Sequence, residues 1–153
     1  MCRQSPRGYQ KVKYSKSGLA LTERFEGCRL VAYWDPLGKV WTIAYGHTRG
    51  VHAGMTCTQE QAVRWLLEDI AFAEQNVNTH VTIPITQGEF DALVDFDFNC
   101  GSANLDSSTL LKLVNAGDRE RAAKEFEKWD HAGGKEVAGL LRRRIAEEAE
   151  FTS

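Results

Sequence analysis

Long apolar runs, paired cysteines and clustered histidines are all missing from this sequence. No stretch approaches the roughly 20 consecutive apolar residues that a helix needs to span a bilayer, and the first residues show no apolar core of a secretory signal. We therefore expect no membrane insertion and no export signal. None of the four cysteines forms a C-x-x-C pair, and the four histidines are scattered along the chain. This spacing predicts free thiols, no metal site and no cofactor.

Charge is unevenly distributed along the chain. The 153 residues carry a net charge of −2, and the hydrophobic and charged fractions of 42% and 26% are typical of one globular domain. Residues 1–20, however, contain basic side chains and no acid. We expect a basic, flexible leader over residues 1–17 that is simply solvated. The alternative is a contact with an anionic polymer such as lipopolysaccharide or wall glycan; we do not expect a nucleic-acid partner.

Turn and cap residues divide the first third of the chain. Ser17 is a possible N-cap and predicts a short helix, 18–26, that ends at Gly27. Two β-prone runs flank the turn-forming stretch DPLGK, which predicts a hairpin over 29–45. The Gly-rich residues 46–57 are expected to form a loop with a short third strand.

The remaining two thirds of the chain have helical patterns. Thr58 with Gln61 and Thr86 with Glu89 form two capping boxes, and the first opens a long helix, 59–79. The second precedes the run FDALVDFDF. Further helices are predicted at 107–115, 119–130 and 136–150. The acids between 60 and 97 are expected to lie mostly on solvent-facing helix surface.

Strands followed by helices predict an α+β fold with segregated elements. We expect one domain over 18–153, composed of a small N-terminal β-hairpin lobe (18–57), a connecting helix (58–80) and a larger helical lobe (81–153). The three successive arginines, 142–144, cannot all point outward from a helix, so one can turn inward towards an acid.

Two acids are isolated among aromatic and glycine residues between positions 24 and 48. Glu26 falls in the last turn of the first helix, and Asp35 falls on the hairpin. Glycoside hydrolysis needs such a pair: a protonated carboxyl that gives its proton to the leaving oxygen, and an ionised one that acts on water or carbon. Burial among apolar groups would raise the pKa of the first. Residue types alone leave structural alternatives open, because Glu26 could pair with Arg24 or Arg29 and Asp35 could simply begin a turn.

Three motifs in order resemble those of phage-type lysozymes, the muramidase endolysins of glycoside hydrolase family twenty-four. The family pattern E-G-x-R-L-x-x-Y-x-D followed by T-I-G-Y-G-H-T stands here as EGCRLVAYWD and TIAYGHT. The stretches FNCGSANLDSSTLLKLVNAGD and WDHAGGKEVAGLLRRRIAE are similar to two later family motifs. The chain departs from the pattern at Lys39, an extra turn residue, and at Ala44, where glycine is commoner.

The resemblance implies a role for each matching residue. Glu26 would be the general acid, Asp35 would activate water or steady the developing cation, and Thr42 would help to hold that water. His47 would brace the small lobe beside the acid, and an arginine of 142–144 would lie near the site. The implied substrate-binding residues are Gly46, His47, Phe98, Asn99 and Ser108.

The same resemblance implies a phage endolysin that hydrolyses the β-1,4 bond between N-acetylmuramic acid and N-acetylglucosamine and so lyses the host. We expect a monomer that stays in the host cytoplasm until a phage holin opens the membrane, and then acts in the periplasm on the cell wall. Two other functions stay open: a peptidoglycan-binding module without catalysis, and a transglycosylase, which needs one acid and no water-activating aspartate.

Overall fold

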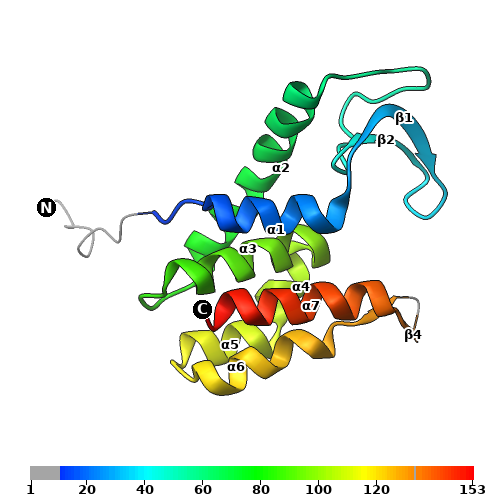
Figure 1. Cartoon of the computed structure of the whole chain (residues 1–153). Coiled ribbons are helices and arrows are strands. Elements are labelled where there is room, and N and C mark those ends of the chain that lie inside the picture. The colour runs from blue at the N-terminus through cyan, green and yellow to red at the C-terminus, as the bar shows by residue number, and fades with distance from the viewer. Residues whose placement is uncertain (1–10, 133) are drawn as a thin grey trace, which may run out of the picture.

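The computed structural model describes residues 11–132 and 134–153 (Figure 1). Its elements, in chain order, are α1 (Lys16–Glu26), β1 (Arg29–Asp35), β2 (Val40–Ala44), α2 (Gln59–His80), α3 (Gln87–Cys100), α4 (Ser102–Ser107), α5 (Thr109–Asn115), α6 (Arg119–Glu125), the 3₁₀ turn η1 (Phe126–Lys128), β3 (His131–Ala132), β4 (Lys135–Glu136) and α7 (Ala138–Phe151). The predicted α+β fold class is confirmed. In Figure 1, α2 leads from the β1–β2 hairpin to the stacked helices.

The first helix starts earlier than predicted. Ser15, not Ser17, is its N-cap, and the Ser15 hydroxyl accepts a hydrogen bond from the backbone of Gly18. The Ser15 backbone also donates to Asp91, and the Val12 backbone donates to Asn78 at 3.0 Å. Residues 12–15 are therefore attached to the helical part of the molecule, which moves the end of the predicted leader towards the N-terminus. Its first ten residues lie outside the described part of the chain.

The predicted hairpin is present. Strands β1 and β2 pair antiparallel with Asp35 opposite Val40, and the pairing is irregular between Arg29 and Tyr33. Lys39 in the turn has a positive φ of 52°, as does Ala44 at the strand end with 57°. No named strand forms over residues 46–57, where the prediction placed one. Two isolated bridges, Val31–Thr56 and Ile43–His47, fold this loop back onto the hairpin instead.

Both predicted capping boxes form, at Thr58 and at Thr86. The apolar stripe of α2 faces the core, and α3 lies between α1 and α7 in Figure 1 with side chains buried on every side. The expectation that the acids of 60–97 face solvent is wrong for α3. Its acidic residues are all buried: Glu89, Asp91, Asp95 and Asp97.

The C-terminal helices differ from the predictions in where they begin and end. The predicted helix 107–115 is preceded by α4, which the pattern did not reveal, and the chain turns at Ser108 between α4 and α5. The segment 119–130 tightens into η1 after Glu125. The last helix begins at Ala138, because residues 131–132 and 135–136 form the small β3–β4 hairpin.

Candidate active site

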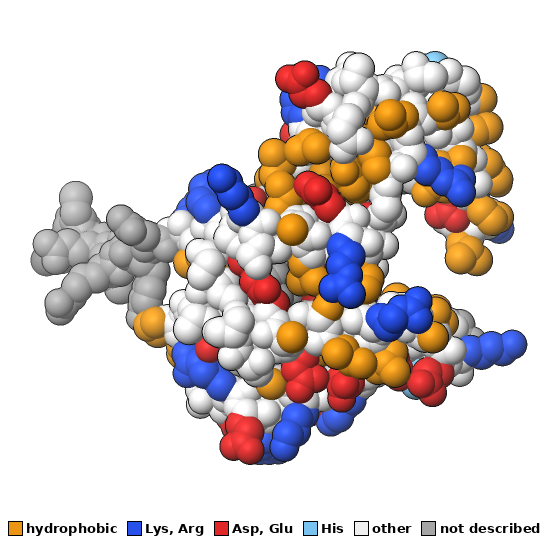
Figure 2. All heavy atoms as spheres, in the orientation of Figure 1, with side chains coloured by type: hydrophobic (Ala, Val, Ile, Leu, Met, Phe, Trp, Pro, Cys, Tyr) orange, Lys and Arg blue, Asp and Glu red, His pale blue; other side chains and the backbone are white. Residues whose placement is uncertain are grey.

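A cleft with a volume of about 620 Å³ separates the β1–β2 hairpin from the helical body. Figure 2 shows the hollow between these two parts, on the right of the view. Both predicted catalytic carboxyl groups line it, together with the predicted hydroxyl and three predicted substrate contacts. These lining residues are Glu26, Asp35, Thr42, Gly46, Phe98 and Asn99.

Glu26 reaches the cleft from the C-terminal end of α1. The helix ends there because Gly27 adopts a positive φ of 63°, which a side chain would disfavour. Gly46 comes close on the other side: a Cβ at this position would lie 3.3 Å from Glu26 Oε2. The predicted apolar surrounding of Glu26 is wrong in one respect, because Arg143 Nη1 donates to Glu26 Oε1 at 2.7 Å.

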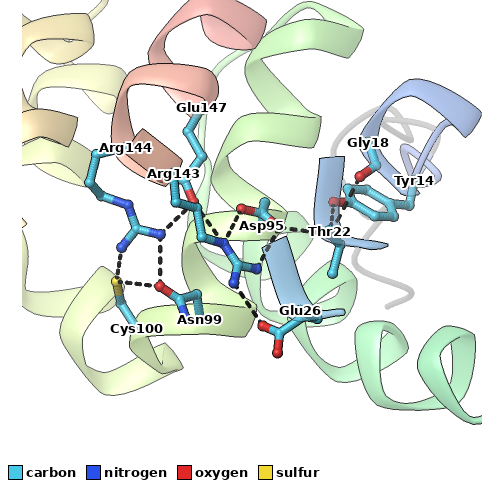
Figure 3. Close-up of polar contacts among 10 residues, drawn as sticks. All are labelled: Tyr14, Gly18, Thr22, Glu26, Asp95, Asn99, Cys100, Arg143, Arg144 and Glu147. Carbon is cyan, nitrogen blue, oxygen red and sulfur yellow. Dashed lines mark hydrogen bonds and ion pairs between the residues drawn. The ribbon is translucent and has the colours of Figure 1, made fainter. Parts of the chain in front are cut away.

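Arg143 connects the cleft to a buried ion network, which Figure 3 shows. Its side chain is 5% exposed, and its Nε and Nη2 each donate to the Asp95 carboxylate at 2.9 Å. Asp95 also accepts from the Thr22 hydroxyl at 2.7 Å, and that hydroxyl lies 2.6 Å from the Tyr14 hydroxyl. One of the three arginines thus turns inward towards an acid, as the helical spacing predicted, and it bridges Asp95 to Glu26.

Arg144 is buried as well, which the sequence did not predict. Its guanidinium donates to Glu147 Oε1 at 2.6 Å, to the Asn99 side chain at 2.8 Å and to the sulfur of Cys100 (Figure 3). Because Asn99 also lines the cleft, the network reaches a second residue of its wall. Burial raises the pKa of the Cys100 thiol to about 11, so this cysteine stays protonated at neutral pH.

The two buried acids of this network titrate in opposite directions. Burial opposes ionisation of Asp95, but hydrogen bonds from Arg143 and from its other neighbours outweigh burial and hold the pKa of Asp95 below its usual value. Burial raises the pKa of Glu147 well above its usual value, and the hydrogen bond and charge of Asp95 raise it further. Glu147 therefore retains its proton where Asp95 is ionised.

Asp35 ends β1 on the opposite wall and is half-buried. Its Oδ1 accepts a hydrogen bond from the backbone of Leu37 at 3.0 Å, which fixes the carboxylate at the start of the turn. Gly38 leaves room for it, because a Cβ at that position would lie 2.8 Å from Asp35 Oδ2. The predicted turn role and the predicted place in the site are thus both present. Thr42, on β2, is buried and lines the cleft.

His47 and Ser108 do not line the cleft. The imidazole Nδ1 of His47 is hydrogen-bonded to Asp69 at 2.8 Å and its ring is stacked on Trp65, so it ties the loop after β2 to α2. This geometry supports the brace interpretation over sugar contact. Ser108 is buried as the N-cap of α5, where its hydroxyl accepts from the backbone of Leu111. A direct contact between Ser108 and substrate has no support in this geometry.

Five further residues line the cleft that sequence reasoning did not identify: Tyr33, Thr48, Arg49, Asp69 and Phe72. Tyr33 and Thr48 stand in the quoted family motifs, although no role was predicted for them, whereas Arg49, Asp69 and Phe72 belong to no such motif. Residues 11–132 and 134–153 contain no group of three or more His, Cys, Asp or Glu side chains that could hold a metal ion. None of the helices in this part of the chain has the length and apolar character to cross a membrane.

An α+β fold whose cleft carries one carboxyl group on a helix end and one on a facing hairpin has the arrangement of a lysozyme-like glycoside hydrolase. Residues 23–147 match the phage lysozyme family model, and the chain belongs to that family.

Its relatives include an endolysin of Acyrthosiphon pisum secondary endosymbiont phage 1, which is 45% identical over 91% of this chain and 97% of the relative. The muramidase domain of SpmX from Asticaccaulis excentricus has a similar structure, with a TM-score of 0.87 and 36% identity over 92% of this chain and 98% of that one. A P22 lysozyme is similar as well, with a TM-score of 0.84 and 35% identity over 93% and 99% of the two chains. Membership of the family makes this chain a glycoside hydrolase of the lysozyme type.

Proposed function

We propose that the chain is a phage endolysin that acts as an endo-muramidase and cleaves the β-1,4 bond between N-acetylmuramic acid and N-acetylglucosamine in peptidoglycan. The observation that carries this proposal is that Glu26 at the end of α1, Asp35 at the end of β1 and Thr42 on β2 all line one cleft. A protein that only binds glycan needs neither a pair of carboxyl groups nor a hydroxyl in the same cleft.

In this proposal Glu26 is the general acid. Its Oε1 is occupied by Arg143, while Oε2 lies on the side of Gly46 and the cleft. Oε2 is therefore the oxygen that carries the proton to the glycosidic oxygen. Once that proton has left, Arg143 compensates the negative charge on Glu26, because the ion pair is largely shielded from solvent.

Asp35 and Thr42 act on the other face of the sugar. The Asp35 carboxylate, whose orientation the Leu37 backbone fixes, accepts a proton from a water molecule that Thr42 helps to position. Attack by this water on the anomeric carbon gives inversion, the outcome typical of a pair of acids about 6.5–9.5 Å apart with room for water between them.

Clearing of chloroform-treated Gram-negative cells tests the proposal. Glu26→Gln should lower the clearing rate by about 10²–10⁴-fold, the usual contribution of a general acid. Glu23→Gln is the matched control, because Glu23 lies one turn earlier on α1 and does not line the cleft. Clearing by Glu26→Gln at the wild-type rate would refute the assignment.

Mass spectrometry of the released fragments separates the alternatives. Hydrated reducing ends are expected of a muramidase, whereas 1,6-anhydro ends would identify a transglycosylase. Binding to purified wall without release of reducing ends would identify a binding module.

We further propose that the enzyme is a monomer that waits in the host cytoplasm and reaches the periplasm through a membrane opened by a phage holin. The support is the location of the substrate, which lies outside the cytoplasmic membrane. Prompt lysis of cells that express the enzyme without a holin would contradict this route.

A further inference from the structure

A cation lies beside an exposed aromatic ring on the cleft wall that α2 forms. The guanidinium carbon of Arg49 is 5.3 Å from the centroid of the Phe72 ring, and Arg49 Nη2 donates to Asp69 Oδ1 at 3.1 Å. Asp69 and Phe72 are three residues apart on α2, and such residues are neighbours on a helix surface. A single guanidinium can therefore contact both, and all three residues line the cleft.

Buried groups hold this arrangement in place. The other oxygen of the Asp69 carboxylate is hydrogen-bonded to His47 Nδ1 at 2.8 Å. His47 is itself 6% exposed, and its ring is stacked on Trp65 with 4.9 Å between centroids and an interplanar angle of 11°. Asp69 thus has a fixed position, and so does the guanidinium that it binds. Arg49 is oriented before any ligand arrives, which reduces the entropic cost of binding.

Arg49 and Phe72 are both largely exposed where they line the cleft. The Arg49 side chain is 59% exposed, and Asp69 takes one of its five N–H donors. Phe72 is 62% exposed in the middle of a helix, where burial of such a side chain would be worth about 1.5–3 kcal/mol. The structure thus leaves an apolar surface and several charged donors side by side and accessible.

The charges along the cleft favour Arg49 as the place where a ligand carboxylate binds. Among the described residues that line the cleft, Arg49 is the one cation, and Glu26, Asp35 and Asp69 are acids. A ligand carboxylate is repelled near the ionised Asp35 carboxylate. It is attracted at Arg49, where a fixed cation offers donors of the geometry that carboxylates prefer.

We propose that Arg49 and Phe72 form a substrate subsite, in which Phe72 packs against the apolar face of a sugar ring and Arg49 binds a carboxylate attached to the glycan. The proposal rests on the function proposed above, which makes peptidoglycan the ligand. Peptidoglycan offers this chemistry from two sources: the peptide stem, and the lactyl group of N-acetylmuramic acid where no stem is attached. The subsite selects such strands over a neutral glycan.

Equilibrium binding to the Glu26→Gln protein tests the subsite without turnover. Three soluble glycan fragments serve as probes: strands with peptide stems, strands stripped of stems by an amidase, and stripped strands whose carboxylates have been amidated with methylamine. Adding Arg49→Gln should raise Kd about five- to tenfold for the carboxylate-bearing probe that the subsite recognises, a loss of about 1–1.4 kcal/mol. Kd for the amidated strands should stay the same.

The probes also distinguish the two sources. If the stem supplies the carboxylate, the effect of Arg49→Gln disappears on stripped strands; if the lactyl group supplies it, the effect persists there and disappears after amidation. Phe72→Ala should weaken all three probes alike, since it removes an apolar contact. Arg121→Gln is the matched control, because Arg121 is also exposed and paired with an aspartate but lies outside the cleft.

Equal effects of Arg49→Gln on charged and amidated strands, or no effect on any probe, would overturn the subsite. The outcome is independent of the catalytic proposal: failure of the wild-type protein to hydrolyse these strands would refute the proposed function, while the Kd differences would still decide whether the subsite exists.

Discussion

Replacing Asp95 by asparagine should destabilise the protein strongly, although the two side chains have the same shape. The change removes the negative charge that faces two N–H donors of Arg143 at 2.9 Å, at a site where Asp95 is 0% exposed. Arg143 would keep Glu26 as its remaining close anionic partner, and Glu26 is 20% exposed. No cavity forms, so the loss of stability comes from a buried guanidinium charge that has lost its fully buried anionic partner.

Breaking one partner of a buried ion pair typically costs about 3–5 kcal/mol. For a chain of this size, each kcal/mol lowers Tm by about 2–4 °C, so the expected fall is roughly 6–20 °C. Arg143→Met should cost a similar amount, because Asp95 would then be buried without its cation. In the double variant Asp95→Leu/Arg143→Met, by contrast, neither charge remains, and replacement of a buried ion pair by apolar groups is often neutral or stabilising.

Urea unfolding of the wild type, both single variants and the double variant measures these free energies. The double variant should lose less stability than either single variant. It should nevertheless clear cells at least about tenfold more slowly, because the arginine that orients Glu26 is gone. Losses below about 1 kcal/mol in the single variants, or a double variant that is less stable than either single variant, would refute the account of the network.

Two further perturbations follow from individual residues. Burial raises the pKa of Glu147, so the folded protein keeps a proton that the unfolded chain releases above about pH 4.5. The contribution of Glu147 to the free energy of unfolding therefore falls as pH rises from about 4.5 towards the folded-state pKa. Glu147→Gln mimics the protonated form, so urea midpoints should shift in favour of the variant between pH 5 and pH 8; parallel profiles would contradict this. Lys39→Gly removes the strain of a positive φ of 52° at an exposed turn position, and should stabilise by about 0.5–1 kcal/mol, the left-handed penalty less the entropic cost of glycine. An unchanged or lower Tm would show that the turn holds Lys39 without strain.

Local signals were sufficient for most of the fold. The capping boxes at Thr58 and Thr86 depend on residues three apart, and the hairpin depends on a Pro- and Gly-containing turn, so short segments contain the information. The errors occur where tertiary contacts decide. Ser15 and Ser17 are equally good caps in isolation, and the contact of Ser15 with Asp91 favours the earlier helix start. The acids of α3 read as solvent-facing because no local pattern reveals their distant partners.

The site residues, too, differ in whether a local sequence pattern predicts them. Glu26, Asp35 and Thr42 stand in motifs with characteristic spacing, and the structure brings them to one cleft. Arg143 could be anticipated only as one of three adjacent arginines. No sequence pattern indicates the pairing of Arg49 with Phe72. The two residues are 23 positions apart, and they come into contact only because the loop after β2 packs against α2. Pairings of this kind are determined by the fold as a whole.

The buried acids of α3 explain how a helix outside the hairpin determines the position of the proposed catalytic acid. Each has partners on a different segment, so the charges define how the neighbouring elements pack around α3. The pairs are Asp91 with Ser15, Asp95 with Arg143, Asp97 with Asn76 and Ser102, and Glu89 with Arg119.

Among these acids, Asp95 is the one that a single side chain connects to Glu26. Thr22 of α1 and Arg143 of α7 both donate hydrogen bonds to Asp95, and Arg143 also donates to Glu26. Helices α1 and α7, which come from opposite ends of the sequence, are thus both hydrogen-bonded to the Asp95 carboxylate. A shift of α7 against α3 would move the guanidinium and with it the Glu26 carboxylate. The acids of α3, which were expected to face solvent, thus help to position the proposed catalytic acid.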